Sequence, residues 1–168
     1  NQGLDTVQDA LDRVAWVGQD RVIGMEQPFP KDRPDLHAAL RAATEVPIYG
    51  DESIQSLADL EAQADKFSGV NVKLMKCGGL DRVKELIDRA RELGHKVMLG
   101  SMSESSLGCT AMAWYADQSD VVDLDGPWLI KNDPFKGMIM RNGNVVLPEG
   151  PGFGVVLTAE LNWTPIGA

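Results

Sequence analysis

Five short apolar segments alternate along this chain with longer segments of helical periodicity. The helical segments repeat their apolar residues three or four positions apart, as residues 80–93 do most clearly. Short apolar strands that alternate with helices are typical of parallel βα units, in which the helices cover the sheet. We therefore expect an α/β fold with about five parallel strands. The predicted strands are residues 21–26, 47–50, 70–74, 96–100 and 121–124, and the predicted helices are residues 4–17, 34–43, 57–67, 80–93 and 106–115.

The end of the chain follows a different pattern. Asn142-Gly143 lies between two apolar stretches, residues 138–141 and 145–147, which is typical of a β hairpin. We expect residues 1–131 to carry the βα units. Residues 132–168 are then a C-terminal segment that contains the hairpin.

Charge and cysteine content restrict the classes of partner and the compartment. The 168 residues include 25 acidic and 16 basic side chains, for a net charge of −9. A negative surface disfavours nucleic acids and anionic membranes as partners, and no apolar run approaches the ~20 residues of a membrane span. Cys77 and Cys109 have neither metal-binding nor redox spacing. We expect them to be reduced thiols of a cytoplasmic protein.

Polar residues lie at the carboxyl end of every predicted strand. In parallel α/β folds, ligands bind and catalytic side chains lie at this edge of the sheet. Strands between helices are otherwise apolar, and a charged group among them needs a partner, a metal ion or water. We therefore expect the functional site at this edge. Its candidate residues are Glu26, Asp51, Lys73, Ser101 with Glu104, and Asp123 with Asp125.

Glu26 and Asp51 are carboxylates at the ends of neighbouring strands. Mg²⁺ binds a few carboxylates and keeps other positions for water or substrate oxygens, so the pair favours a magnesium site. The alternative is that each carboxylate caps the helix that follows it.

Lys73 lies within an apolar strand. A lysine in an apolar site is poorly solvated and can carry a proton during catalysis. Alternatively, its stem lies along the helix layer and its ammonium group reaches water. Lys76 is a weaker candidate, because we expect it in a solvated loop. His37 and His95 are expected at the opposite edge of the sheet, and we assign neither a catalytic role.

Asp123 and Asp125 are two positions apart, so in an extended segment both point to the same side. Such a pair could hold an ammonium group. The alternative, a solvated acidic loop, is the commoner outcome for this spacing.

Three motifs together resemble the muconate-lactonizing branch of the enolase superfamily: Glu26-Gln27-Pro28, Asp51-Glu52-Ser53 and residues 72–79. The resemblance covers nearly the whole chain. Residues 100–105, followed by residues 123–126, are similar to the dipeptide epimerases of that branch. The resemblance implies the C-terminal part of a (β/α)7β barrel with a capping domain. It also implies Mg²⁺ and a 1,1-proton transfer through an enolate intermediate on a dipeptide such as Ala-Glu.

The same resemblance implies a role for each candidate residue. Glu26 and Asp51 would be metal ligands, and Lys73 would be one of two acid/base lysines. Ser101 would contact the substrate. Asp123 and Asp125 would bind the free ammonium group of the dipeptide. The C-terminal segment would return to the capping domain.

Three parts of such enzymes have no counterpart here: the first metal ligand, the second lysine in a K-x-K strand and most of the cap. In those enzymes all three precede the position that corresponds to Asn1. The sequence therefore resembles a C-terminal half that we expect to be inactive alone. Five strands cannot close an eight-stranded barrel. We expect the missing half, or self-association, to cover the open edge of the sheet.

Other functions remain open from the sequence. A muconate cycloisomerase or an N-acylamino acid racemase would use the same barrel, although the Asp123 and Asp125 pair argues against both. A Schiff-base aldolase would use Lys73 as its nucleophile, which the pair of carboxylates disfavours. The half-barrel could also be a non-catalytic module.

Overall fold

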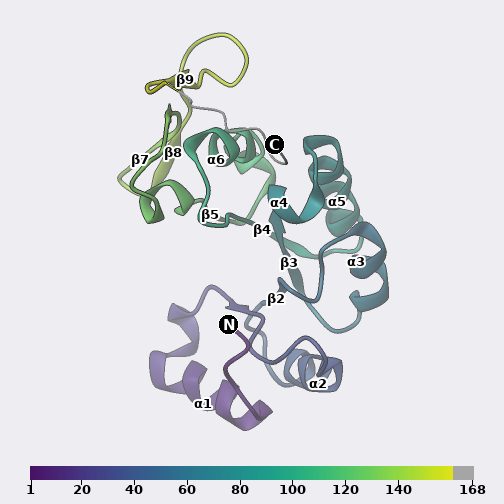
Figure 1. Ribbon diagram of the computed structural model, residues 1–168. Helices are drawn as coiled ribbons and strands as arrows, with labels where there is room; N and C mark the ends of the chain where they lie inside the picture. Colours follow the sequence, from purple (N-terminus) through teal and green to yellow (C-terminus); the bar gives the residue numbers. More distant parts are fainter. Residues whose placement is uncertain (161–168) are drawn as a thin grey trace, which may run out of the picture.

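Strands that follow one another in the sequence are also neighbours in the sheet. The computed structural model describes residues 1–160 and contains a five-stranded parallel sheet in the order β1-β2-β3-β4-β5. Figure 1 shows the sheet curving, with helices α2, α3 and α5 along its outer side. The predicted α/β fold with five parallel strands is confirmed. The strands are β1 (Met25–Glu26), β2 (Ile48–Gly50), β3 (Gly69–Lys73), β4 (Lys96–Gly100) and β5 (Val121–Asp123).

Local sequence signals determine where several helices begin. Thr6 caps the first helix in a capping box, in which its side chain and that of Asp9 bond each other's backbone N–H. Ser56 caps α3 by accepting from the N–H of Asp59, and Pro34 occupies the first position of α2. The helices are α1 (Val7–Val17), α2 (Pro34–Ala43), α3 (Leu57–Gln63), α4 (Leu74–Cys77), α5 (Leu80–Glu92) and α6 (Ser106–Ala113), with short 3₁₀ helices η1 (Gln19–Arg21), η2 (Ala116–Gln118) and η3 (Gly126–Leu129).

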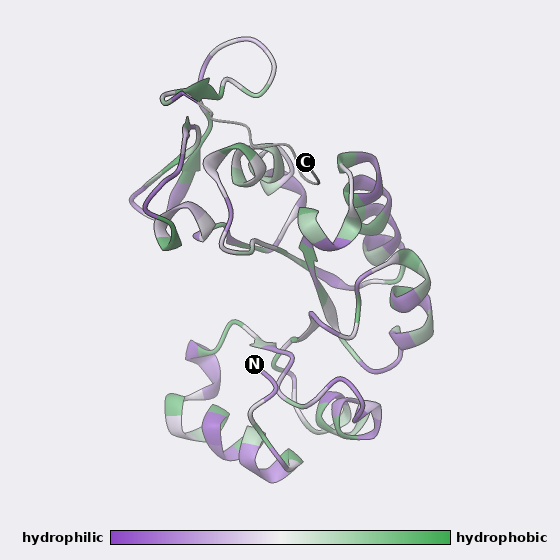
Figure 2. Cartoon of the chain, viewed as in Figure 1, coloured by the Kyte–Doolittle hydropathy of each residue, from purple (hydrophilic) through white to green (hydrophobic). Residues whose placement is uncertain are grey.

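The core lies between the outer face of the sheet and the helices. Alternate residues of β3 and β4 point outward and are fully buried, including Val72 and Leu99. One face of α5 packs on them, and its turns alternate between purple and green in Figure 2 because the opposite face is charged. The buried residues of that helix are Val83, Leu86, Ile87 and Ala90.

The inner face of the sheet carries larger polar side chains beside glycines. Tyr49 of β2 is 1% exposed, and its ring lies against the Cα atoms of Gly24 and Gly69. A Cβ atom at Gly69 would lie 2.6 Å from this ring and 2.9 Å from the carbonyl oxygen of Lys96. Glycine is therefore required there for the tyrosine to cross the inner face.

The C-terminal part forms two small antiparallel sheets. Strands β7 (Ile139–Arg141) and β8 (Asn144–Val146) form the expected hairpin, with positive φ angles of 52° and 77° at Asn142 and Gly143. β6 (Phe135–Lys136) pairs with β9 (Val156–Leu157). Residues 161–168 of the predicted C-terminal segment lie outside the described residues. The return of this segment to a capping domain stays a prediction.

The bounds of β1 and β3 differ from the predicted strands, since β1 is shorter and β3 lies one residue earlier. Only Met25–Glu26 of the predicted strand 21–26 pairs with β2. The residues before Met25 have no partner in β2, because β2 begins at Ile48, which pairs with Met25. Ile23 is accordingly 72% exposed. The predicted strand 70–74 ends at Lys73, where the chain turns into α4. Gly78 then ends that turn in the left-handed conformation, at a φ of 79°.

No helix within residues 1–160 is both long enough and apolar enough to span a membrane.

The packing of β4 predicts a large cost for truncating its buried leucine. Leu99→Ala should lower the free energy of unfolding by about 2–5 kcal/mol, because it leaves a cavity between the sheet and α5. Leu107→Ala is the matched control, since Leu107 of α6 is 39% exposed. Urea unfolding measures both changes, and equal losses for the two variants would contradict this description of the core.

Candidate functional site

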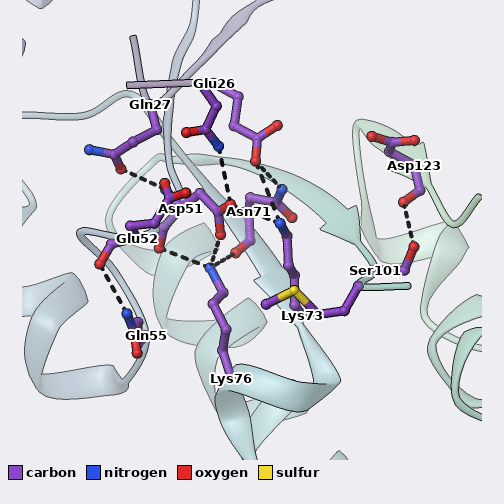
Figure 3. A network of polar contacts seen from close by, with 12 residues as sticks. Glu26, Gln27, Asp51, Glu52, Gln55, Asn71, Lys73, Lys76, Ser101 and Asp123 are labelled. Atoms are coloured by element: carbon purple, nitrogen blue, oxygen red, sulfur yellow. Dashed lines mark hydrogen bonds and ion pairs between the residues drawn. The ribbon is translucent and has the colours of Figure 1, made fainter. Parts of the chain in front are cut away.

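The side chains of Glu26, Asp51 and Lys73 meet at the carboxyl edge of the sheet (Figure 3). The Nζ atom of Lys73 lies 2.8 Å from Oδ2 of Asp51 and 3.7 Å from Oε1 of Glu26. The side chains of Asp51 and Lys73 are 5% and 12% exposed, whereas that of Glu26 is 26% exposed. Three charged groups from three successive strands therefore share one partly enclosed space.

Strand register explains why these side chains converge. Glu26 pairs with Tyr49, Tyr49 pairs with Gly69, and Lys73 pairs with Gly100. Side chains two positions apart share a face, so Asp51 follows Tyr49 onto the inner face at the end of β2. Gly100 leaves room for Lys73, because a Cβ atom there would lie 2.8 Å from Cε of that lysine.

Lys76 is buried in the site, and the prediction that it lies in a solvated loop is wrong. Its side chain is 5% exposed, and Nζ lies 2.6 Å from Oδ1 of Asp51. The same ammonium group donates to the backbone oxygens of Asn71, Asp51 and Ile54 at 2.7, 3.0 and 3.1 Å. The turn α4 brings Lys76 back over the end of β2. The glycines at 78 and 79 signal the end of such a turn and could have indicated it.

Two amide side chains surround the charged groups, and the sequence patterns assign neither of them a role. Asn71 donates to Oε1 of Glu26 through Nδ2, over 2.8 Å. Oε1 of Gln27 accepts from the backbone N–H groups of Asp51 and Ser53, over 3.0 and 3.2 Å. Uncharged residues do not stand out at strand ends, although Gln27 belongs to the Glu26-Gln27-Pro28 motif.

The charges of the site are strongly interdependent. Burial raises the pKa of Glu26, and its contact with Asp51 raises that pKa further. Burial also disfavours the charged form of Asp51, but Lys76 and Lys73 outweigh this and lower the pKa of Asp51. Burial opposes the charge on Lys73, yet Asp51 and Glu26 raise the pKa of its ammonium group. These contacts therefore favour the ammonium form of Lys73 and the ionised form of Asp51, whereas they disfavour the ionised form of Glu26.

Ser101 and Asp123 lie at the same edge, beside this charged group (Figure 3). Oγ of Ser101 accepts from the N–H of Gly126 over 3.0 Å and lies 3.4 Å from the carbonyl oxygen of Asp123. The hydroxyl group thus joins the loops that follow the two strands. Burial raises the pKa of Asp123, and the nearby charge of Asp125 raises it further. A bound ammonium group would oppose this shift, because a nearby opposite charge favours the ionised carboxylate.

The donor atoms fit a hard divalent cation in part. No group of three or more His, Cys, Asp or Glu side chains in the described part of the chain is arranged to hold a metal ion. Glu26 and Asp51 nevertheless offer two adjacent carboxylates, and Mg²⁺ commonly takes one or two carboxylates together with water and substrate oxygens. Beside them, Oε2 of Glu52 and Oδ1 of Asn71 are buried and have no hydrogen-bond partner within residues 1–160. Unsatisfied oxygens of this kind favour a cation.

His37 lies at the same edge as the site, and the prediction that it lies at the opposite edge is wrong. It is in the first turn of α2, directly after the loop that leaves β1, and its ring contacts Gln27. His95 precedes β4 and therefore does lie at the amino edge. The position of His37 follows from chain direction, since each helix of a βα unit begins at the carboxyl edge.

Comparison with known proteins relates the whole described region to one family. Residues 1–161 match the family model described as "Enolase C-terminal domain-like". The L-Ala-D/L-Glu epimerase of Bacteroides thetaiotaomicron is 39% identical over 156 residues, which are 93% of this chain and 41% of that protein. The L-Ala-D/L-amino acid epimerase of Pedosphaera parvula is 38% identical over 153 residues, 90% of this chain and 44% of that protein. The chain thus spans less than half the length of these relatives.

Solved structures of similar proteins have the same fold. The dipeptide epimerase of Methylococcus capsulatus, complexed with Mg and the dipeptide L-Arg-D-Lys, has a TM-score of 0.83 and 33% identity, over 93% of this chain and 46% of that one. The L-Ala-D/L-Glu epimerase of Bacillus subtilis has a TM-score of 0.81 and 29% identity, over 95% of this chain and 46% of that one. These relatives are epimerases, which are isomerases, and the predicted enolase-type half-barrel is confirmed.

The contacts of Lys76 predict that its charge is needed for stability. Lys76→Met should lower the free energy of unfolding by about 3–5 kcal/mol, because it leaves a buried carboxylate oxygen without its cation. Lys84→Met removes an exposed ion pair with Asp88 on α5 and should cost less than about 1 kcal/mol. Urea unfolding of both variants tests this difference. A mild effect of Lys76→Met would show that the Lys76–Asp51 contact contributes little.

Proposed function

This chain belongs to the enolase C-terminal domain-like family, and we propose that it forms the catalytic half-barrel of a Mg²⁺-dependent dipeptide epimerase. The observation that carries the proposal is the convergence of Glu26, Asp51 and Lys73 at the carboxyl edge of the sheet. Two relatives that match 90% or more of this chain are named epimerases of L-Ala dipeptides, and two others are named hydrophobic dipeptide epimerases, which supports a dipeptide as the substrate.

Glu26 and Asp51 are the residues proposed to hold Mg²⁺. When bound, the cation supplies positive charge against the negative charge that develops on the substrate carboxylate as its α-proton leaves. The oxygen Oδ1 of Asp51 is engaged by Lys76, so Oδ2 is the oxygen turned toward Glu26 and Lys73. The Methylococcus epimerase is complexed with Mg together with a dipeptide, which supports this choice of ion.

Lys73 is the proposed acid/base group on one face of the substrate. Its ammonium group is held by Asp51 and Glu26, and these contacts raise its pKa. A cation that engaged the two carboxylates would weaken that influence and lower the pKa of Lys73, so that more of the neutral amine, which is the form that accepts a proton, would be present. Inversion at a carbon atom requires a second proton carrier on the opposite face. Lys76 does not fill this role in our proposal, because four oxygens surround its ammonium group.

Asp123 and Asp125 are proposed to bind the free ammonium group of the dipeptide, and Ser101 to contact the substrate beside them. Two neighbouring carboxylates repel each other, and an ammonium group between them would offset that repulsion. These residues also separate dipeptides from N-acylated substrates, which have no charge at that position.

The proposed second half of the barrel covers the edges of the sheet. Within residues 1–160, β1 and β5 each pair with one neighbour only. We propose that additional strands, from an upstream half or from a second copy, complete the barrel, and that the segment after residue 131 returns to a capping domain. We also place the protein in the cytoplasm, since Cys77 and Cys109 are free and buried.

The main alternative is a racemase of N-acylated amino acids. An N-acetyl-D-glutamate racemase of a Pseudoalteromonas species is 35% identical over 112 residues, which supports this reaction on the same half-barrel. A muconate cycloisomerase and a non-catalytic module are further alternatives. Assays with different substrates distinguish them, because each alternative predicts a different substrate or none.

Completing the barrel should produce epimerase activity. We expect the 168 residues alone to bind Mg²⁺ weakly and to epimerise no dipeptide. The same residues joined to the part of the Bacteroides relative that precedes the matched region should epimerise L-Ala dipeptides when Mg²⁺ is added. NMR detection of α-proton exchange in D₂O measures both. Within this chimera, Lys73→Ala should abolish activity and Lys84→Ala should not. Turnover by the 168 residues alone would refute the need for a second half, whereas activity only on N-acylated substrates would favour the racemase.

Removing either acid after β5 should affect only substrates with a free amino group. In the active chimera, Asp123→Asn or Asp125→Asn should raise the KM for dipeptides about tenfold or more, because an ion pair to the ammonium group is lost. The kinetics of N-acetylated dipeptides should not change. Asp117→Asn, an exposed substitution on η2, is the control. A similar change in KM for both classes of substrate would argue against ammonium recognition by these residues.

A further inference from the structure

We propose that His37 is a positioning residue that fixes the orientation of the Gln27 side chain and thereby the loop that presents Asp51. Its meaning for catalysis rests on the proposed function, in which Glu26 and Asp51 share a cation. The structural part of the proposal is independent of that function, since it concerns hydrogen bonds between β1, β2 and α2. Neither the family motifs nor the charge pattern of the sequence identifies this residue.

Gln27 connects the ends of two strands. Its side chain is completely buried, and its backbone has a positive φ of 37°, which is unusual for a residue other than glycine. Its backbone N–H donates to the carbonyl oxygen of Tyr49, over 2.9 Å. Its side-chain oxygen accepts from the N–H groups of Asp51 and Ser53. Gln27 is also adjacent to Glu26, so it ties one candidate metal ligand directly to the backbone of the other.

The side-chain nitrogen of Gln27 faces the Ser53 hydroxyl group, the loop after β1 and α2. Nε2 lies 2.8 Å from Oγ of Ser53, 3.2 Å from the carbonyl oxygen of Phe29 and 3.2 Å from Nε2 of His37. If the amide were reversed, its NH₂ group would face the two N–H donors of Asp51 and Ser53. Its oxygen would at the same time face the carbonyl oxygen of Phe29. The loop after β2 therefore depends on one orientation of this amide.

His37 supplies the acceptor that favours this orientation. Nδ1 lies 3.0 Å from the carbonyl oxygen of Arg33, which can only accept, so Nδ1 carries the proton. In the neutral ring, Nε2 is then a lone-pair acceptor for the Gln27 NH₂ group. The ring is packed between Phe29 and Phe67, at centroid distances of 5.2 and 4.7 Å. Burial in this apolar setting lowers the pKa of His37, which agrees with a neutral ring.

The tautomer of His37 can be tested without any substitution. Nitrogen NMR of the imidazole in the complete chain at neutral pH should show a protonated Nδ1 and an unprotonated Nε2. A proton on Nε2, or a charged ring, would overturn the proposal, because neither form accepts from Gln27.

A pair of histidine substitutions tests the positioning role. His37→Phe keeps an aromatic ring between Phe29 and Phe67 but removes the acceptor. We expect hydrogen exchange at the Asp51 and Ser53 amides to become about tenfold faster, the effect of losing about one hydrogen bond. His95→Phe is the matched control. His95 is also buried and lies near a backbone carbonyl, at 3.0 Å from that of Ala64, but at the other edge of the sheet. His95→Phe should leave hydrogen exchange at the Asp51 and Ser53 amides unchanged.

A metal titration links the positioning role to the site. Binding of Mn²⁺, used as a probe for a magnesium site and followed by electron paramagnetic resonance, should weaken about fivefold or more in His37→Phe and stay unchanged in His95→Phe. His37→Gln retains an acceptor oxygen and should lie closer to the original chain in both measurements.

The outcomes separate this proposal from the proposed function. Unchanged amide exchange in His37→Phe, or Mn²⁺ affinity that falls equally in both histidine variants, would overturn the positioning role. If the original chain binds no Mn²⁺ at all, the proposed metal site fails, and the NMR tautomer together with amide exchange still decides whether His37 positions the loop.

Discussion

The site depends on how the charge of one buried carboxylate is balanced. Asp51 is almost completely enclosed, and a carboxylate in such a place is costly unless cations and donors surround it. Lys76 engages one of its oxygens and Lys73 the other, while Gln27 holds its backbone. The two lysines have different tasks. Lys76 is held among backbone oxygens, whereas the partners of Lys73 within residues 1–160 are side-chain carboxylates, which can exchange that lysine for another cation.

Side chains alternate between the two faces of each strand, so the residues that form the core and the residues of the site lie on opposite faces of the sheet. In β3, Val70 and Val72 point into the helix layer, and Asn71 and Lys73 point to the inner face. The outer residues supply the core, so the inner positions can be polar without loss of the main hydrophobic stabilisation. Tyr49 bounds this polar region toward the amino ends of the strands, since its ring crosses the inner face over Gly24 and Gly69.

The sequence allows the fold and the charged residues of the site to be predicted, because both produce strong patterns. Alternating apolar periodicities indicate the βα order, and a charge at the end of an apolar strand is conspicuous. The exact ends of β1 and β3 are not predictable in the same way, since they depend on which neighbour is available for pairing. The burial of Lys76 produces no periodic signal, because α4 is a single turn, and only Gly78-Gly79 indicate that the turn is there. The contact between His37 and Gln27 escapes prediction because a buried histidine leaves no pattern and its partner is uncharged.

The order of the strands also bears on how such proteins diversify. The residues proposed for proton transfer and metal binding come from β1 to β3, whereas Ser101, Asp123 and Asp125 follow β4 and β5. Gly100 separates the two groups and contributes no side chain of its own. If the proposed roles hold, a mutation in the loop after β5 changes which molecule is recognised while the reacting centre is preserved. Proteins with this fold can thus acquire new specificities through successive substitutions after β4 and β5. The residues of β1 to β3 can meanwhile be conserved for the same chemistry.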